Sequence, residues 1–353
     1  MRPRRLAALR RAGIAAALAV LLGACERAVL GPDPSRDRVA VFDAAWSAFD
    51  AHFAYFADQG LDWDAVRARL RPRAEAAAND QALYDVVCEL VRATRSYHSV
   101  LVDQGGRRCG PDFAFAATRD PALVARYLAE PARPTASRQM AYARLSADRG
   151  GAGIGYVWVP AFGGDGWGAE IDDALAALGD VRGVVIDARG NTGGNDGNAR
   201  AIAARFADAE RAYVRRRFRT GPARDAFGPW VTTSLAPAGR RFAGPVVLLT
   251  DRRVASAAES FTLMLRALPT VVVIGDTTSG TASNPLPRDL PNGWWVTVPQ
   301  SQETTPDGTV PIEGRGIAPA VVVRPAAGDA ARGVDRMLEA AIASVRQRLG
   351  GAR

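Results

Sequence analysis

Apolar side chains follow a helical spacing in the first part of the chain. From residue 39 to residue 56 they recur every three or four positions, which gathers them on one face of a helix: Val39, Phe42, Trp46, Phe49, Phe53 and Phe56. Asp62 or Asp64 can cap a second helix, and Asp80 a third. The spacing therefore predicts a helical N-terminal subdomain over residues 39–102, with a β-like stretch at its end.

After residue 150 the pattern changes to short apolar runs that alternate with amphipathic stretches. Continuous β-branched runs are typical of strands buried on both faces of a parallel sheet, and here they span residues 154–159, 181–188, 245–250 and 271–274. A β-hairpin is expected near the C-terminus, between 294–298 and 309–312. Alternation of strands and helices predicts an α/β domain over residues 151–345. Residues 103–150 are expected to form a connecting segment.

The first 38 residues carry a secretion signal. A basic start and an apolar run at 14–22 are followed by small residues, as in a signal peptide over residues 1–24. The run is too short for a permanent membrane span. It ends in Leu-Gly-Ala-Cys, which resembles the lipobox of bacterial lipoproteins and implies that Cys25 becomes the acylated first residue, followed by a tether at 25–38. An ordinary secretion signal with an incidental cysteine is the alternative.

The lipobox resemblance implies a cell-envelope protein, held to a membrane by its lipid alone, on the periplasmic or another extracytoplasmic face. In such an oxidising compartment Cys88 and Cys109 can form a disulfide. The bond would close a loop of about 20 residues, worth roughly 3 kcal/mol of unfolding free energy. A buried free thiol at Cys88 and an exposed one at Cys109 is the alternative.

Composition restricts the chemistry that the chain can perform. All 45 basic residues among its 353 residues are arginines. The absence of lysine excludes Schiff-base chemistry, phosphate-loop NTPases and Ser–Lys dyads. Only His52 and His98 remain as acid–base groups near neutral pH, too few for a multi-histidine metal site, so neither a metal nor a cofactor is expected.

The net charge of +8 is concentrated at the N-terminus. Residues 1–24 contain five arginines and no acidic residue. The rest of the chain therefore has 40 basic and 37 acidic residues, an excess of +3. No nucleic-acid partner is expected, because the basic excess belongs mostly to the secretion signal.

Two loops follow buried strands, at the sheet edge where α/β domains bind ligands. The glycines of residues 187–194 allow backbone N–H groups to converge on a phosphate or an oxyanion, and a plain tight turn is the alternative. In residues 254–259, Ser256 and Glu259 have the spacing of a capping box. The flanking alanines and the helix dipole would equally suit a nucleophile at Ser256.

Four segments, in this order, resemble the tail-specific protease domain of the S41 serine peptidases. They are Asp-Ala-Arg-Gly-Asn-Thr-Gly-Gly at 187–194, Ala-Ser-Ala-Ala-Glu at 255–259, Ile-Gly-Asp-Thr-Thr-Ser-Gly at 274–280 and Glu-Gly-Arg-Gly-Ile-Ala-Pro at 313–319. The ordered set is far more specific than any single member. The resemblance implies a crotonase/ClpP-like α/β catalytic domain.

By this resemblance Ser256 is the nucleophile, and the backbone around Gly193 and Gly194 forms the oxyanion hole with the Ala257 N–H. Carboxyl-terminal processing proteases of the family have a lysine base where this chain has Thr281. They also contain a PDZ domain, for which the connecting segment is too short. The substrate would be a peptide or a protein.

The chain is more similar to the tricorn-core branch of the family, which uses histidine. Tyr97-His98-Ser99 lies where that branch has a Gly-His-Thr-like element, so the resemblance implies that His98 is the general base and Glu313 the acidic third residue. A hydrogen-bonded structural histidine is the alternative for His98. His52 is interpreted as structural, and turn and cap roles account for Asp187 and Glu259.

Together these features predict a lipid-anchored serine endopeptidase that hydrolyses peptide bonds through an acyl-enzyme. The alternative is a non-catalytic lipoprotein that binds a ligand or a peptide on the same scaffold, since a fold does not determine a function. Trp294, Trp295 and the aromatic first helix would supply an apolar surface for that role.

Overall fold

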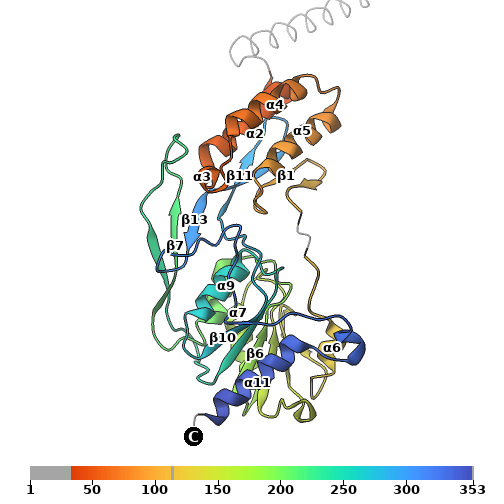
Figure 1. Cartoon of the computed structure of the whole chain (residues 1–353), viewed down its shortest axis with the longest axis vertical. Coiled ribbons are helices and arrows are strands. Elements are labelled where there is room, and N and C mark those ends of the chain that lie inside the picture. Colours follow the sequence, from red (N-terminus) through yellow and green to blue (C-terminus); the bar gives the residue numbers. More distant parts are fainter. Residues whose placement is uncertain (1–32, 113–114, 352–353) are drawn as a thin grey trace, which may run out of the picture.

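The computed structural model describes residues 33–112 and 115–351. Figure 1 shows two lobes along the long axis, a helical lobe formed by the first described residues and an α/β lobe that contains the C-terminal helix. Within the two described ranges, no helix combines the length and the apolar character that a membrane crossing requires. The predicted signal peptide, Cys25 and most of the tether lie outside the described residues.

The helical lobe confirms the periodicity of the first hundred residues. Its helices are α2 (Arg38–His52), α3 (Phe56–Gln59), α4 (Trp63–Glu75) and α5 (Asp80–Ala93). The aromatic side chains of α2 are buried against α4, where Trp46 and Trp63 stack with their ring centroids 6.4 Å apart. The spacing of large apolar residues was therefore a sufficient signal for these helices.

The helix caps agree with the sequence at one position and differ at another. Asp62 caps α4, since its carboxylate accepts a hydrogen bond from the Ala65 N–H at 2.9 Å. The cap of α5 is Asn79 and not Asp80, because Asn79 has extended backbone angles and accepts from the Ala82 N–H at 2.9 Å. Asp80 occupies the first turn, where its charge complements the helix dipole.

A four-stranded antiparallel sheet completes the helical lobe, and half of it comes from the far end of the chain. In order across the sheet its strands are β11 (Pro285–Asp289), β12 (Trp295–Pro299), β1 (Val100–Val102) and β2 (Arg108–Cys109). Trp294 and Val296 are buried with the apolar faces of the helices in a single core. The helical lobe thus depends on residues 285–299 as well as on the predicted 39–102.

The hairpin near the C-terminus exists, but its predicted pairing was wrong. β12 pairs with β11 and not with residues 309–312. The reason is the turn at 290–294, where the Leu290 N–H donates to the Trp294 carbonyl at 2.7 Å. The Asp307–Gly308 turn instead folds 305–311 back on itself through the Thr305–Val310 hydrogen bond.

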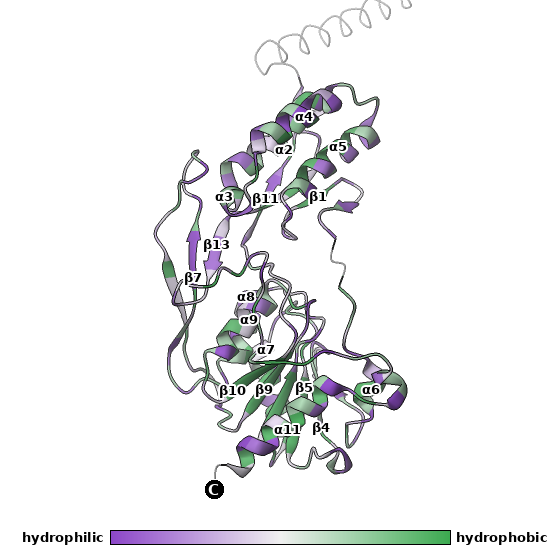
Figure 2. Ribbon diagram, viewed as in Figure 1, coloured by the Kyte–Doolittle hydropathy of each residue, from purple (hydrophilic) through white to green (hydrophobic). Residues whose placement is uncertain are grey.

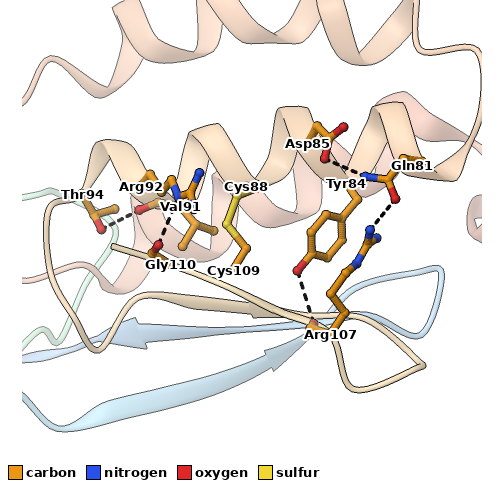
Figure 3. Close-up of a disulfide and its surroundings, with 10 residues drawn as sticks. All are labelled: Gln81, Tyr84, Asp85, Cys88, Val91, Arg92, Thr94, Arg107, Cys109 and Gly110. Atoms are coloured by element: carbon orange, nitrogen blue, oxygen red, sulfur yellow. Dashed lines mark hydrogen bonds between the residues drawn. A yellow bond between two sulfur atoms is a disulfide. The ribbon is translucent and has the colours of Figure 1, made fainter. Parts of the chain in front are cut away.

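Cys88 on α5 and Cys109 on β2 are joined by a disulfide, with their Cα atoms 5.7 Å apart (Figure 3). The Tyr84 hydroxyl lies one turn earlier on the same helix and donates to the Arg107 carbonyl at 3.2 Å. The Arg107 guanidinium also covers the Tyr84 ring, 3.5 Å from its centroid. These contacts fix β2 against α5, and His98 lies in the segment of chain between these two elements.

A seven-stranded mixed sheet forms the centre of the α/β lobe. In order across the sheet its strands are β14 (Val321–Val322), β10 (Val271–Gly275), β9 (Val246–Thr250), β6 (Gly183–Asp187), β5 (Ile154–Trp158), β4 (Ala141–Arg144) and β3 (Arg133–Pro134). The first five strands are parallel, and β4 and β3 add antiparallel. The segment 103–150, expected to connect, therefore contributes two strands to this sheet.

Helices cover both faces of this sheet, and the central strands are strongly apolar (Figure 2). Val184 and Ile186 pack on one face, with α7, α8 and α9, whereas Val185 packs on the other, with α6 and α11. The helices are α6 (Pro121–Ala125), α7 (Trp167–Leu178), α8 (Asp196–Ala203), α9 (Ala257–Arg266) and α11 (Arg336–Gly350). The short helices are η1 (Pro34–Arg36), η2 (Ala147–Arg149) and α10 (Asp329–Arg332).

A three-stranded sheet at one side connects the two lobes (Figure 1). It consists of β13 (Ser301–Thr304), β7 (Arg211–Phe218) and β8 (Val231–Leu235). Beyond β7, the Arg219 guanidinium donates to the Phe53 carbonyl at 2.7 Å. These contacts hold the helical lobe, which carries His98, in place over the α/β lobe.

Candidate active site

Ser256 lies between the end of β9 and the start of α9, at the edge of the sheet predicted to bind ligands. Its backbone has φ 58° and ψ −127°, a conformation that is rare for a residue with a side chain. Its hydroxyl makes no capping hydrogen bond to α9. A capping box therefore does not explain Ser256, and strained residues of this kind cluster at functional sites.

The glycine-rich loop packs directly against this serine. A Cβ atom at Gly193 would lie 2.7 Å from the Ser256 Cβ and 2.9 Å from the Ala257 nitrogen. The Gly193 N–H donates to the Asn191 side chain at 2.8 Å. Within the described ranges, the N–H groups of Gly194 and Ala257 have no acceptor. The residues that directly follow Gly193 and Ser256 thus each have a backbone N–H that is free to bind an oxyanion.

His98 is half-buried, in the loop between α5 and β1. Its Nδ1 lies 3.0 Å from the Ser283 Oγ, and its carbonyl accepts from the Thr297 hydroxyl at 2.6 Å. Burial lowers the pKa of His98 to about 4, against a smaller opposing effect of the Ser283 backbone. The ring is therefore neutral at pH 7, the protonation state that a general base requires.

Ser283 joins the two halves of the site, and sequence reasoning missed it. It lines the same pocket as Ser256 while it is hydrogen-bonded to His98. His98 makes its side-chain hydrogen bond to Ser283 and not to Ser256. A lone serine outside any motif gave no signal, and the two residues meet because β12 pairs both with β1, which follows His98, and with β11, which follows Ser283.

Glu313 is half-buried, and no hydrogen bond joins it to the His98 ring. One carboxyl oxygen accepts from the Ser96 hydroxyl at 2.5 Å, and the other from the Ala282 N–H at 3.1 Å. Burial raises the pKa of Glu313 to about 8, and the nearby Glu259 carboxylate adds to the increase. The residue is therefore mostly protonated at neutral pH, and it reaches His98 only through the loop at 96–98.

Glu259, Asp187 and His52 have structural partners. The buried Glu259 accepts from the N–H groups of Gly280 and Thr281 at 2.8 and 2.6 Å, and the Thr281 carbonyl accepts the Ser256 N–H. Asp187 is paired with Arg189. His52 lies at the end of α2, and its Nε2 is 3.1 Å from a guanidinium nitrogen of Arg288. Glu259 thus shapes the loop that holds the backbone of Ser256.

A pocket of about 280 Å³ opens at Ser256. Its walls include the oxyanion-hole candidates Gly194 and Ala257, and Ser260 one turn further along α9. Three charged residues line its other side: Asp196, Arg216 and Glu303. Burial raises the pKa of Glu303 to about 7, although Arg216 opposes this effect.

Comparisons with known proteins agree with this geometry. Residues 153–323 match the sequence model of Peptidase family S41, and residues 34–92 match that of the Tricorn protease C1 domain. A putative peptidase from Parabacteroides merdae has a similar structure, with a TM-score of 0.77 and 27% identity over 87% of this chain and 96% of that chain. The α/β lobe and the helical lobe thus each match a sequence model from the kind of peptidase that the motifs resemble.

More distant structures share the fold. A lipoprotein from Streptococcus agalactiae has a TM-score of 0.60 and 17% identity over 90% of this chain and 97% of that chain. The photosystem II D1 C-terminal processing protease has a TM-score of 0.53 and 16% identity over 86% of this chain and 98% of that chain. The predicted α/β fold with its helical N-terminal region is confirmed. The matches of residues 153–323 to Peptidase family S41 and of residues 34–92 to the Tricorn protease C1 domain identify the chain as a serine-type peptidase.

Proposed function

We propose that the chain is an endopeptidase that uses Ser256 as nucleophile and His98 as general base. The observation that carries this proposal is the strained backbone of Ser256. The Ser256 hydroxyl does not cap α9, and the residue lines a pocket together with Gly194 and Ala257, whose N–H groups have no acceptor among the described residues. A capping serine would have helical neighbours but no need for positive φ. The attack of Ser256 on a peptide carbonyl would give an acyl-enzyme, which water then hydrolyses.

The oxyanion formed in this attack would be held by the backbone. The N–H groups of Gly194 and Ala257 are the donors, and the positive end of the α9 dipole adds to their effect. Gly193 contributes its lack of a side chain, because a Cβ there would collide with Ser256. Its own N–H is engaged by Asn191 and supports the shape of the loop.

In the proposed mechanism Ser283 orients the base. Its Oγ holds Nδ1 of His98, which leaves Nε2 to take the proton from Ser256 and to return it to the leaving amine. Glu313 is not hydrogen-bonded to the base. It is a positioning residue that accepts hydrogen bonds from the Ser96 hydroxyl and the Ala282 N–H and so fixes the two segments that carry His98 and Ser283. A hydroxyl in place of a carboxylate beside the ring is consistent with the low pKa of His98.

A fluorophosphonate probe tests this assignment. Wild-type protein is expected to be labelled at Ser256, labelling is expected to vanish in Ser256→Ala and to fall sharply in His98→Ala, and Ser260→Ala is the matched control from the same pocket wall. Equal labelling of wild type and Ser256→Ala would refute the nucleophile. Because an esterase would also be labelled, digestion of a peptide library is the second measurement. A non-catalytic binding lipoprotein would give neither signal.

We also infer that Cys25 is acylated and anchors the chain to the outer side of a membrane. Support comes from the Leu-Gly-Ala-Cys sequence and from the similar fold of a lipoprotein from Streptococcus agalactiae. The full chain expressed in a bacterial host is expected to enter the detergent phase of a Triton X-114 extract, and Cys25→Ser to remain in the aqueous phase. Wild-type protein in the aqueous phase would contradict the anchor.

A further inference from the structure

The charged side of the pocket at Ser256 has no part in the chemistry proposed above. Arg216 donates through Nε to one oxygen of Glu303 at 2.6 Å. The same guanidinium lies 3.7 Å from the Asp196 carboxylate, which is a loose ion pair. Two carboxylates therefore share one guanidinium, and the cluster has an excess of negative charge when both are ionised.

Glu303 is buried in an unusual way. Only 4% of its surface is exposed, yet the residue lines the pocket. Its Oε1 is bonded to Arg216, whereas no donor in the described ranges reaches its Oε2. A carboxylate oxygen that lines a pocket and receives no donor from the protein can accept a hydrogen bond from a ligand. The pocket thus offers one free carboxylate oxygen of Glu303 to a bound side chain.

The remaining walls suit the stem of a long side chain. Ala257, Ala282 and Pro285 contribute apolar surface to the lining of the same pocket. Asp196, at the first turn of α8, keeps 45% of its side chain exposed. A flexible basic side chain can lay its methylene groups on such a wall and place its charged end among carboxylates.

From these observations we propose that Asp196 and Glu303 form a subsite for an arginine or lysine side chain of the substrate, next to the scissile bond. The bound cation would donate to the free oxygen of Glu303 and pair with Asp196, while Arg216 keeps Glu303 in position. The site rests on the proposed function, since it assigns a preference to the pocket that holds Ser256. A pocket governed by Arg216 would instead select an acidic side chain.

The test compares two peptides that differ at the residue flanking the scissile bond, one with arginine and one with citrulline, its neutral near-isostere. Wild type is expected to cleave the arginine peptide with a kcat/KM at least about 10-fold higher. Asp196→Asn and Glu303→Gln are each expected to reduce this ratio several-fold. Asp180→Asn, at an 88% exposed carboxylate before β6 at the opposite edge of the sheet, is expected to leave it unchanged.

Failures of the subsite and of the catalytic proposal can be told apart. Fluorophosphonate labelling of Ser256 is measured on the same wild-type preparation. If Ser256 is labelled but both peptides are cleaved alike, or a glutamate peptide is preferred, the subsite is refuted and the catalytic proposal stands. If Asp196→Asn and Glu303→Gln both retain the full ratio, the subsite is refuted as well. If wild type is not labelled, the catalytic proposal falls and the subsite with it.

Discussion

Ser256→Ala is expected to lower kcat for a susceptible peptide by about 10⁶-fold, and His98→Ala to lower it almost as much. The reason is that nucleophile and base act as a unit: without His98 the hydroxyl keeps its proton, and without Ser256 the base has nothing to activate. The double variant should therefore be no slower than Ser256→Ala alone. The measurement is kcat for all three variants on one peptide. Losses that multiply in the double variant would contradict a shared step.

The chain offers a matched control for each change. Ser260→Ala removes another hydroxyl from the same pocket, and His52→Ala removes the second histidine of the chain. The kcat of both control variants is expected to stay within a few-fold of the wild-type value.

The pH dependence of kcat/KM identifies the base independently. Because the lowered pKa leaves His98 neutral down to about pH 4, kcat/KM should decline only as the pH falls through about 4. A decline centred near 6.5 would point to an exposed histidine.

The parts of the fold that the sequence predicted are those with a local physical signal. The strands at 183–187, 246–250 and 271–275 are largely buried on both faces, so their positions are apolar except for Asp187 and Thr250 at the ends that lead into the site. The loops at 187–194 and 254–259 follow two of these strands, and their closeness results from parallel pairing of β6 with β9. Motif and topology together thus located the centre of the site.

The elements that were missed have no comparable signal. β7 reads Arg-Ala-Tyr-Val-Arg-Arg-Arg-Phe, and its arginines are partly buried as apolar residues would be. Arg217 stacks on Phe227 and Trp230, with its guanidinium 4.3 and 4.7 Å from the ring centroids. Long arginine stems that cover aromatic rings remove the alternation of polar and apolar positions on which strand prediction depends.

Contacts between distant segments were a second obstacle. The pairing of β1 with β12 joins residues about 200 positions apart, and neither strand has a sequence pattern that predicts which strand it pairs with. Together with the pairing of β12 with β11, the β1–β12 pairing places Ser283 beside His98, and Glu313 reaches Ser96 from the segment after β13. Resemblance to a family suggested Glu313 as a partner of the histidine, but it could not reveal that the contact passes through Ser96 and that Ser283 holds the ring.

A buried ion-pair network connects the glycine-rich loop to the C-terminal helix, and breaking it is expected to have the largest effect on stability. Arg189 and Asp187 have fully buried side chains joined at 2.7 Å, and Arg189 also reaches Asp335 at 2.9 Å. Burial raises the pKa of Asp187, but Arg189, with smaller effects from Arg119 and the Tyr156 hydroxyl, outweighs burial and lowers the pKa. Asp335 caps α11 through the Leu338 N–H at 3.1 Å. Loop and helix thus depend on one guanidinium.

Arg189→Met is expected to reduce the free energy of unfolding by about 3–5 kcal/mol, because it removes the cation nearest to two buried carboxylates and leaves Asp187 only the more distant Arg119. Urea unfolding measures this loss, with Arg144→Met as the control. Arg144 pairs with the exposed Asp180, so its loss should cost far less than the loss of Arg189.

A triple variant separates charge from packing. If unpaired charge is the cause, Asp187→Asn and Asp335→Asn in the Arg189→Met background should recover part of the loss, because neutral amides are cheaper to bury than lone carboxylates. If packing of the arginine stem is the cause, the triple variant should be no more stable than Arg189→Met. A loss no greater than that of Arg144→Met would show that the network does not hold the loop. Arg189 belongs to the glycine-rich loop that packs against Ser256. Loss of the ion pairs should therefore also weaken fluorophosphonate labelling of Ser256 at urea concentrations below those that unfold the protein.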